Sequence, residues 1–162
     1  MEKTTNTVYY RITSLLNKNN IPYKEIKHPP EGETVRVSQL RGNDLSQAAK
    51  AMVIQLKLSK KEKLYYLTVI PGDRRLDFEK IRNLNKAQKV MLAPKEKAEI
   101  LTECEMGTVP PFSFNNELPL LVDPSLKENK EIIFNAGQLD CSIKLEIRHY
   151  LNLTKPKIVE IT

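Results

Sequence analysis

Ala51-Met52-Val53-Ile54-Gln55-Leu56 and Leu64-Tyr65-Tyr66-Leu67-Thr68-Val69-Ile70 are two nearly uninterrupted apolar runs, and a lysine-rich segment, 57–63, separates them. Strands that are apolar on both faces are typical of central strands, which other elements cover on both sides. The short polar segment between the runs is typical of a hairpin-like connection. These residues therefore predict two central, adjacent strands of a sheet.

Shorter elements surround this pair. Apolar residues recur at helical spacing from Val8 to Leu16, which predicts an amphipathic helix. We expect further short helices at 34–41, closed by Gly42, and at 77–84, 94–101 and 149–153. We expect further strands at 21–26, 90–92, 118–122, 131–134, 141–147 and 157–161. Strands and helices do not alternate regularly, so the prediction is an α+β (mixed α/β) fold and not a Rossmann or barrel fold. Residues 1–162 would form one compact domain, with a mixed, mostly antiparallel sheet surrounded by short helices.

The composition excludes several classes of protein. Of 162 residues, 40% are hydrophobic and 28% charged, which is typical of soluble globular proteins. The N-terminus does not resemble a secretory signal, and no stretch approaches the roughly 18 apolar residues of a membrane span. We therefore expect a cytoplasmic protein that does not contact membranes. Cys104 and Cys141 are expected to be reduced thiols, and the cysteine and histidine spacing predicts no metal site and no cofactor.

The positive charge is concentrated in one part of the chain. The net charge is +6, and residues 57–97 contain 12 Lys or Arg and 5 Asp or Glu, whereas residues 98–126 contain no Lys or Arg. Such asymmetry can give a fold one positive face, to which polyanions bind. A charge run taken alone more often indicates a solvated surface, so both interpretations stay open.

Common catalytic signatures are missing: the chain has no Gly-x-Ser-x-Gly, no phosphate-binding glycine loop and no His-Glu-x-x-His. An enzyme of this sequence would work without a side-chain nucleophile.

Three features of the sequence remain as candidates for a functional site. Lys50 stands directly before the first apolar run, and either reaches into a cleft or extends along the core to water. The loop 107–114 is rich in glycine, proline and phenylalanine, and either presents backbone N–H groups to a carbonyl or is a structural turn. The stretch 134–137 ends in Gly137, which is typical of a hairpin turn.

Together these features resemble a known family. Ala-Lys50-Ala before an apolar strand, then Gly107-Thr108-Val109-Pro110-Pro111-Phe112, then Phe134-Asn135-Ala136-Gly137 and an alternating strand resemble the YbaK/prolyl-tRNA synthetase-associated editing domain family. The resemblance runs from about Tyr9 to about Leu151. It implies a free-standing trans-editing deacylase that hydrolyses the ester of a mischarged tRNA. The candidate amino acids are alanine, cysteine and serine, and the candidate tRNA is one related to tRNA-Pro. It also implies that a ribose hydroxyl of the tRNA and backbone amides activate the water.

The same resemblance implies site residues. Lys50 and Gly107 would be catalytic: Lys50 would hold the substrate and Gly107 would offer its backbone amide to the ester carbonyl. Gly137 would line the opposite wall. The full set of implied substrate-binding residues is Thr108, Val109, Pro110, Pro111, Phe112, Gly137, Met52, His28 and Thr34. The coarse strand pattern adds Val35 and Leu67 to Met52 and Phe112 as apolar wall candidates. The implied partners are a mischarged tRNA and a prolyl-tRNA synthetase or other synthetase.

Two departures from the family pattern keep alternatives open. Leu139 stands where many relatives carry a histidine, and Ser113 stands where glycine is expected. One alternative is therefore a catalytically weak module of the same fold that binds tRNA or a synthetase. Another is a regulatory partner that docks through an exposed apolar patch containing Phe112 and Phe114.

Overall fold

The computed structural model describes residues 2–162, with side chains described from Thr7 onward. Its helices are α1 (Glu2–Lys18), α2 (Thr34–Arg41), α3 (Phe78–Asn85), α4 (Lys95–Thr102) and α5 (Ile147–Thr154), with short 3-10 helices η1 (Leu45–Gln47) and η2 (Pro124–Glu128). Its strands are β1 (Lys24–Lys27), β2 (Ala49–Lys57), β3 (Lys63–Pro71), β4 (Lys89–Leu92), β5 (Leu120–Val122), β6 (Glu131–Gln138), β7 (Cys141–Glu146) and β8 (Lys157–Ile158).

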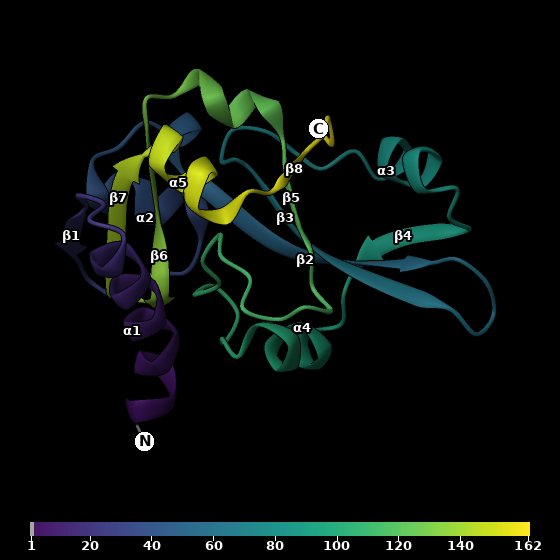
Figure 1. Cartoon of the computed structure of the whole chain (residues 1–162), viewed down its shortest axis with the longest axis horizontal. Helices are drawn as coiled ribbons and strands as arrows, with labels where there is room; N and C mark the ends of the chain where they lie inside the picture. Colours follow the sequence, from purple (N-terminus) through teal and green to yellow (C-terminus); the bar gives the residue numbers. More distant parts are fainter. Residues whose placement is uncertain (1) are drawn as a thin grey trace.

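The strands form two sheets where the sequence led us to expect one. The larger sheet has the order β4-β2-β3-β5-β8, and the smaller one has the order β1-β7-β6 (Figure 1). Pairing is antiparallel except between β3 and β5 and between β5 and β8. A single parallel bridge, from Ala48 to Ile133, joins the two sheets. The α+β architecture is confirmed, but an apolar pattern shows which residues form a strand and not which strand they pair with.

The central hairpin is as predicted. β2 and β3 pair along their whole length, from Ala49 opposite Pro71 to Lys57 opposite Lys63, and each has a further strand on its other side. One face of β2 packs Ile54 and Leu56 with residues of α3 and β4, and the other packs Val53 with residues of α4. Figure 1 accordingly shows α3 and α4 on opposite sides of the hairpin. This double covering explains why the two runs are apolar on both faces.

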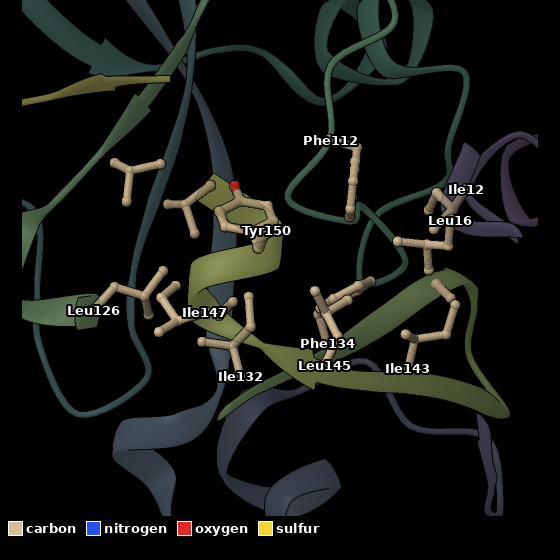
Figure 2. Close-up of a cluster of buried hydrophobic side chains, with 14 of the residues drawn as sticks. Ile12, Leu16, Phe112, Leu126, Ile132, Phe134, Ile143, Leu145, Ile147 and Tyr150 are labelled. Carbon is tan, nitrogen blue, oxygen red and sulfur yellow. The ribbon is translucent and has the colours of Figure 1, made fainter. Parts of the chain in front are cut away.

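The smaller sheet has its own core. Ile12 and Leu16 of α1 are fully buried against β6 and β7, in the same cluster as Phe112, Phe134 and Tyr150 (Figure 2). The Tyr150 hydroxyl donates a 2.6 Å hydrogen bond to the carbonyl of Pro111, and burial raises the pKa of this phenol. The core therefore fixes one end of the loop 107–114.

Gly137 has a different role from the hairpin turn that its sequence suggests. β6 continues to Gln138, with an irregular register between Asn135 and Gln138, and the turn follows at 139–140. Gly137 has φ +80°, and a Cβ atom there would lie 3.3 Å from Val8 and Tyr9 of α1. The glycine allows α1 to approach the sheet closely.

The remaining predictions of local structure hold with small shifts. α2 ends at Gly42, whose φ is +74°, and Asp77 caps α3 by accepting a hydrogen bond from the backbone N–H of Lys80. β1 begins three residues later than expected, at Lys24. None of the helices in the described part of the chain has the length and apolar character that crossing a bilayer requires.

A buried carboxylate fastens the C-terminal segment to β5. Asp123 is 2% exposed and accepts hydrogen bonds from the backbone N–H groups of Ile161 (2.8 Å), Thr162 (3.2 Å) and Ser125 (3.1 Å), and from the Ser125 hydroxyl. Burial alone would raise the pKa of Asp123, but these hydrogen bonds outweigh burial and lower it.

We predict that Asp123→Asn lowers the free energy of unfolding by about 2 kcal/mol at pH 7, because an amide cannot accept all of these bonds. A lowered folded-state pKa contributes stability above the unfolded-state pKa, and this contribution is lost as pH falls through the folded-state value. The difference between variant and wild type should therefore shrink in acid. Urea unfolding at several pH values measures it, with the exposed Asp140→Asn as control. Equal stability of Asp123→Asn and wild type at pH 7 would contradict the assigned role.

Candidate functional site

A cavity of about 260 Å³ lies where β2 runs past the end of β4. β4 pairs only with residues 54–57 of β2, so the first half of β2 has no full strand on that side. Side chains and backbone from α2, β2, the end of β4, α4, the loop at 105–109 and β6 line this space: Gly32, Thr34, Val37, Arg41, Ala48, Ala49, Lys50, Ala51, Met52, Val53, Leu92, Ala93, Ala98, Met106, Gly107, Val109, Ile133, Phe134 and Asn135.

The open edge of β2 presents backbone polar groups to the cavity. The Val53 carbonyl accepts a 3.0 Å hydrogen bond from the N–H of Ala93, so the backbone polar groups of Val53 point away from β3. Along a strand, alternate residues direct these groups to the same side. Ala51 therefore directs its N–H and C=O toward the cavity, at a level that β4 does not reach.

Lys50 brings a positive charge to the same wall. It lies on β2, half-buried, and lines the cavity as the sequence analysis expected. Among the residues that the structure describes, no carboxylate forms an ion pair with its ammonium group. An unpaired ammonium in a small cavity is suited to hold an electron-rich ligand atom.

Gly107 lies on the facing loop in a conformation that favours glycine. Its φ is +90°, and a Cβ atom there would lie 3.0 Å from the Cα of Gly32. Its carbonyl accepts a 2.9 Å hydrogen bond from Asn135 Nδ2, whereas its N–H has no partner within residues 2–162. The Gly107 amide is thus a donor that no other described group uses, on a residue that lines the cavity, and such a donor can serve an oxyanion site.

The amide of Asn135 connects the two loops that close the cavity. Besides its bond to the Gly107 carbonyl, its Nδ2 donates to the carbonyl of Glu31 (3.0 Å), and its Oδ1 accepts from the Ser142 hydroxyl (3.0 Å). The Ser142 hydroxyl lies 2.7 Å from Nε2 of His28, whose Nδ1 lies 2.9 Å from the carbonyl of Pro29. This network fixes the loop around Glu31 and the loop around Gly107 relative to β6.

Arg41 adds a second cation, and no carboxylate of the described residues pairs with it. Its guanidinium donates to Asn43 Oδ1 (2.9 Å), Ser142 Oγ (3.1 Å), Asn135 Oδ1 (3.4 Å) and Ser38 Oγ (3.4 Å), all of them neutral. Burial lowers the pKa of Arg41 to about 10, so it stays charged near neutral pH. No Asp or Glu is among the lining residues. The cavity therefore favours a ligand that is negative or becomes negative during reaction.

The structure brings together five of the thirteen residues that the sequence analysis expected at the site. Those that line the cavity are Lys50, Gly107, Val109, Met52 and Thr34. Those that lie behind or away from its wall are Thr108, Pro110, Pro111, Phe112, Gly137, His28, Val35 and Leu67.

Several of these residues support the site from behind. Thr108 is fully buried, and its carbonyl accepts a hydrogen bond from the Gly137 N–H. Phe112 is directed into the core, where its ring meets that of Tyr150 edge-on (Figure 2). Phe114 is 40% exposed, so only one of the two phenylalanines proposed for an apolar patch is at the surface. The residues 108–112 hold the Gly107 end of the loop in place.

The remaining expected wall residues lie elsewhere for simple reasons. His28 belongs to the Asn135–Ser142 network, Val35 is 46% exposed on α2, and Leu67 is buried under α4. Their places depend on strand pairing and on the direction in which α2 faces, which the sequence pattern does not give.

Arg41 and Asn135 were not recognised as site residues from the sequence. Asn135 had a signal, because it interrupts the apolar run 132–136, and a polar residue inside a buried strand needs partners. Arg41 had none, since a basic residue in the last turn of a helix is common.

The thiols lie outside the cavity. Burial raises the pKa of Cys104 and of Cys141 to about 11, so both are protonated near neutral pH. Among the described residues, no group of three or more His, Cys, Asp or Glu side chains is arranged to hold a metal ion.

Comparison with known proteins gives a family and close relatives. The model of a family described as "Aminoacyl-tRNA editing domain" matches residues 28–153. The multifunctional Ser/Thr-tRNA deacylase ProXp-y of Escherichia coli (strain K12) is 33% identical over 152 residues, which cover 93% of this chain and 90% of that protein. The proline--tRNA ligase of Sulfurihydrogenibium sp. (strain YO3AOP1) is 30% identical over 131 residues, which cover 81% of this chain but 21% of that enzyme.

A solved structure supports the fold. The crystal structure of a protein provisionally assigned as a trans-editing enzyme for prolyl tRNA synthetase superimposes with a TM-score of 0.78 at 23% sequence identity. The superposition covers 96% of this chain and 97% of the other. The two-sheet arrangement is thus that of a known fold.

We predict that Gly107→Ala destabilises the protein more than Gly42→Ala does. Both glycines have positive φ, which costs an alanine about 1 kcal/mol. Only Gly107 would also bring a Cβ to 3.0 Å from the Gly32 backbone, whereas nothing lies within 4 Å of the corresponding position at Gly42. We expect a loss of about 2–3 kcal/mol for Gly107→Ala in urea unfolding, against about 1 kcal/mol for Gly42→Ala. Equal losses of stability in the two variants would show that the loops carrying Gly32 and Gly107 can move apart at no cost in free energy.

Proposed function

Because the chain belongs to the aminoacyl-tRNA editing domain family, we propose that it is an editing deacylase, which hydrolyses the ester bond between a wrong amino acid and its tRNA. The observation that carries this proposal is the cavity itself. It combines Lys50 and Gly107, whose ammonium group and N–H have no partner among the described residues, and no carboxylate lines it. Such a site is suited to a reaction whose negative charge develops on the carbonyl oxygen.

The proposed reaction needs no covalent intermediate. Water attacks the ester carbonyl, and the electron pair of the C=O bond moves onto the oxygen, where the Gly107 N–H stabilises the charge. The tetrahedral species then breaks the bond to the ribose oxygen, which leaves with a proton as the terminal hydroxyl, and the free amino acid is released. Lys50 binds and orients the aminoacyl end. A neighbouring ribose hydroxyl of the substrate assists the water, in keeping with a lining that contains no serine and no cysteine.

The size and polarity of the cavity favour small amino acids that carry a hydroxyl. About 260 Å³ is small beside the 300–1,000 Å³ of many ligand sites. Thr34, Arg41 and Asn135 add polar groups to a wall that also carries Lys50 and many apolar side chains. The Escherichia coli relative is named a Ser/Thr-tRNA deacylase, which agrees with this polarity. We therefore propose serine and threonine as the preferred amino acids, ahead of alanine and cysteine.

The proposed setting is trans-editing by this chain as a separate protein in the cytoplasm. One relative corresponds to it over nearly its whole length, whereas in the proline--tRNA ligase the matching region is about a fifth of a longer enzyme. The proposed partners are the mischarged tRNA and a synthetase that produces it.

We predict that wild-type protein releases serine or threonine from mischarged tRNA and that Lys50→Met lowers kcat/KM by about 100-fold. The variant keeps the length and apolar stem of the side chain but removes the charge that holds the substrate. The measurement is release of labelled amino acid from a panel of Ser-, Thr-, Ala- and Cys-tRNA. Lys50→Arg, which keeps the charge, should lose less.

The exposed Lys24→Met serves as control, because it removes one positive charge from a different sheet. Wild-type activity of Lys50→Met would overturn the role of Lys50. No release from any tRNA by wild type would overturn the deacylase assignment and would favour a module that binds without hydrolysis.

We predict that hydrolysis does not depend on the thiols. Both are buried, with pKa values raised to about 11, and neither lines the cavity. Cys104→Ala and Cys141→Ala should therefore keep kcat within about threefold of wild type, even where stability falls by about 1 kcal/mol. Rates measured before and after treatment with a thiol-alkylating reagent under native conditions check this. Rapid, complete inactivation in proportion to alkylation would contradict a mechanism without a cysteine nucleophile.

A further inference from the structure

Three lysines lie side by side at the far end of the larger sheet. Lys57 on β2 is opposite Lys63 on β3 and, on its other side, opposite Lys89 on β4. Residues directly opposite each other on neighbouring strands project from the same face of a sheet. We call Lys57, Lys63 and Lys89 the lysine ladder. It lies where the β2–β3 hairpin reaches away from the smaller sheet (Figure 1).

The lysine ladder is electrostatically unsatisfied. No ion pair involves any of its three ammonium groups within the part of the chain that the structure describes. Lys60 and Lys61, both exposed, follow in the hairpin turn and add to the positive charge. Like charges directly opposite each other destabilise a sheet. The ladder therefore lowers stability in the free protein, and a polyanion would relieve the repulsion.

Other basic residues of the segment 57–97 are already engaged. Arg82 forms a 2.7 Å ion pair with Glu79, and Lys80 donates a 2.8 Å hydrogen bond to the carbonyl of Thr162. Both belong to α3, which packs on the opposite face of the sheet from α4. Arg82 and Lys80 on that face are thus engaged, whereas the ladder on the face of α4 has no ion pair among the described residues.

The lysine ladder shares its face with a wall of the cavity. Val53, Gln55 and Lys57 alternate along β2 and project from the same side, which α4 partly covers. Val53 lines the cavity, and Lys57 is four residues further along, about 13 Å away. Val53 and Gln55 are buried, so a ligand that extends from the cavity to the ladder would pass over the groups that cover them, which include Tyr65 and α4.

The surface between the cavity and the ladder is suited to nucleotides. The Tyr65 hydroxyl donates a 3.0 Å hydrogen bond to Gln55 Oε1, and the Lys97 ammonium lies 5.2 Å from the centre of the Tyr65 ring. A partly exposed aromatic ring beside a lysine is a common contact for a base and its phosphate. Neighbouring strands are about 4.8 Å apart, so the ladder spans roughly 10 Å, enough for a short row of phosphates.

We propose that the lysine ladder binds phosphates of the acceptor arm of the tRNA whose aminoacylated 3′ end enters the cavity. This inference rests on the proposed function, and it divides the binding of substrate between two places. The cavity holds the aminoacyl end, and the ladder, about 13 Å away, holds the nucleic acid through sequence-independent contacts.

The test compares Lys57→Gln/Lys63→Gln/Lys89→Gln with Lys24→Gln/Lys127→Gln/Lys130→Gln. The second variant removes the same charge from exposed lysines on β1, η2 and the residues after η2. Each protein is assayed on full-length seryl-tRNA and on seryl-adenosine, which carries the same ester but no phosphate that the ladder could bind. KM is measured at several salt concentrations.

We expect the ladder variant to lose about tenfold in kcat/KM on seryl-tRNA at low salt, through KM, with unchanged kinetics on seryl-adenosine. The slope of log KM against log salt should fall by about 2, since each lost phosphate contact removes about 0.7–0.9. The melting temperature should not fall, because repulsion has been removed.

Three outcomes would overturn the inference. The first is a ladder variant that behaves like the control variant on seryl-tRNA. The second is an equal loss on seryl-adenosine, which would place the effect at the cavity. The third concerns the case in which wild type hydrolyses neither substrate, so that the proposed function fails but the ladder can still be tested. Binding of uncharged tRNA, followed by fluorescence anisotropy, then decides separately: an unchanged salt slope in the ladder variant would overturn the ladder as a phosphate site.

Discussion

The two hydrogen bonds that Nδ2 of Asn135 donates are the constraint on which the site depends. One ends on the carbonyl of Glu31 and the other on the carbonyl of Gly107, so a single amide on β6 fixes both loops that close the cavity. Gly32 and Gly107 touch beside it, at a distance that leaves no room for a side chain on either. The N–H of Gly107 is available to a ligand because the opposite face of its loop is already held. Catalysis by positioning, without a nucleophile, requires such prior fixing, since a mobile donor would have to be ordered during the reaction.

The apolar cores determine where the loops and strands of the site lie, and the hydrogen-bond network of Asn135 then aligns the two loops. Phe112 and Tyr150 anchor the far end of the Gly107 loop, and α1 presses on β6 where Gly137 leaves space. Each residue of the motif from Gly107 to Phe112 therefore has a structural reason to be present, although few of them reach the cavity. The residues of a family motif can serve to hold a site in place as well as to contact the substrate.

The sequence predicted more of the fold than of the site, for a definite reason. Apolar periodicity identified the central hairpin, α1 and the cap at Gly42, because burial and backbone geometry act locally along the chain. The division into two sheets was not predictable, since pairing joins residues distant in sequence, as Ala48 does with Ile133. At the site, Lys50 and Gly107 were recognised through resemblance, whereas Arg41 lies there only because α2 faces β6. From the sequence, Phe112, His28 and Gly137 were assigned to the cavity wall. In the structure, Phe112 packs in the core, His28 belongs to the Asn135–Ser142 network, and Gly137 lies against α1.

The early end of β4 has a consequence for how such pockets can change. Because β4 stops at Leu92, the cavity is a gap in a sheet, closed by loops that belong to other parts of the chain. A strand two residues longer would fill the gap with main chain, and a shorter one would widen it, while every side chain on the far wall stayed the same. The length of one edge strand therefore sets the capacity of the pocket independently of the groups that face the ligand. Insertions and deletions at the end of β4 offer a route to new selectivity that point substitutions on the wall do not provide.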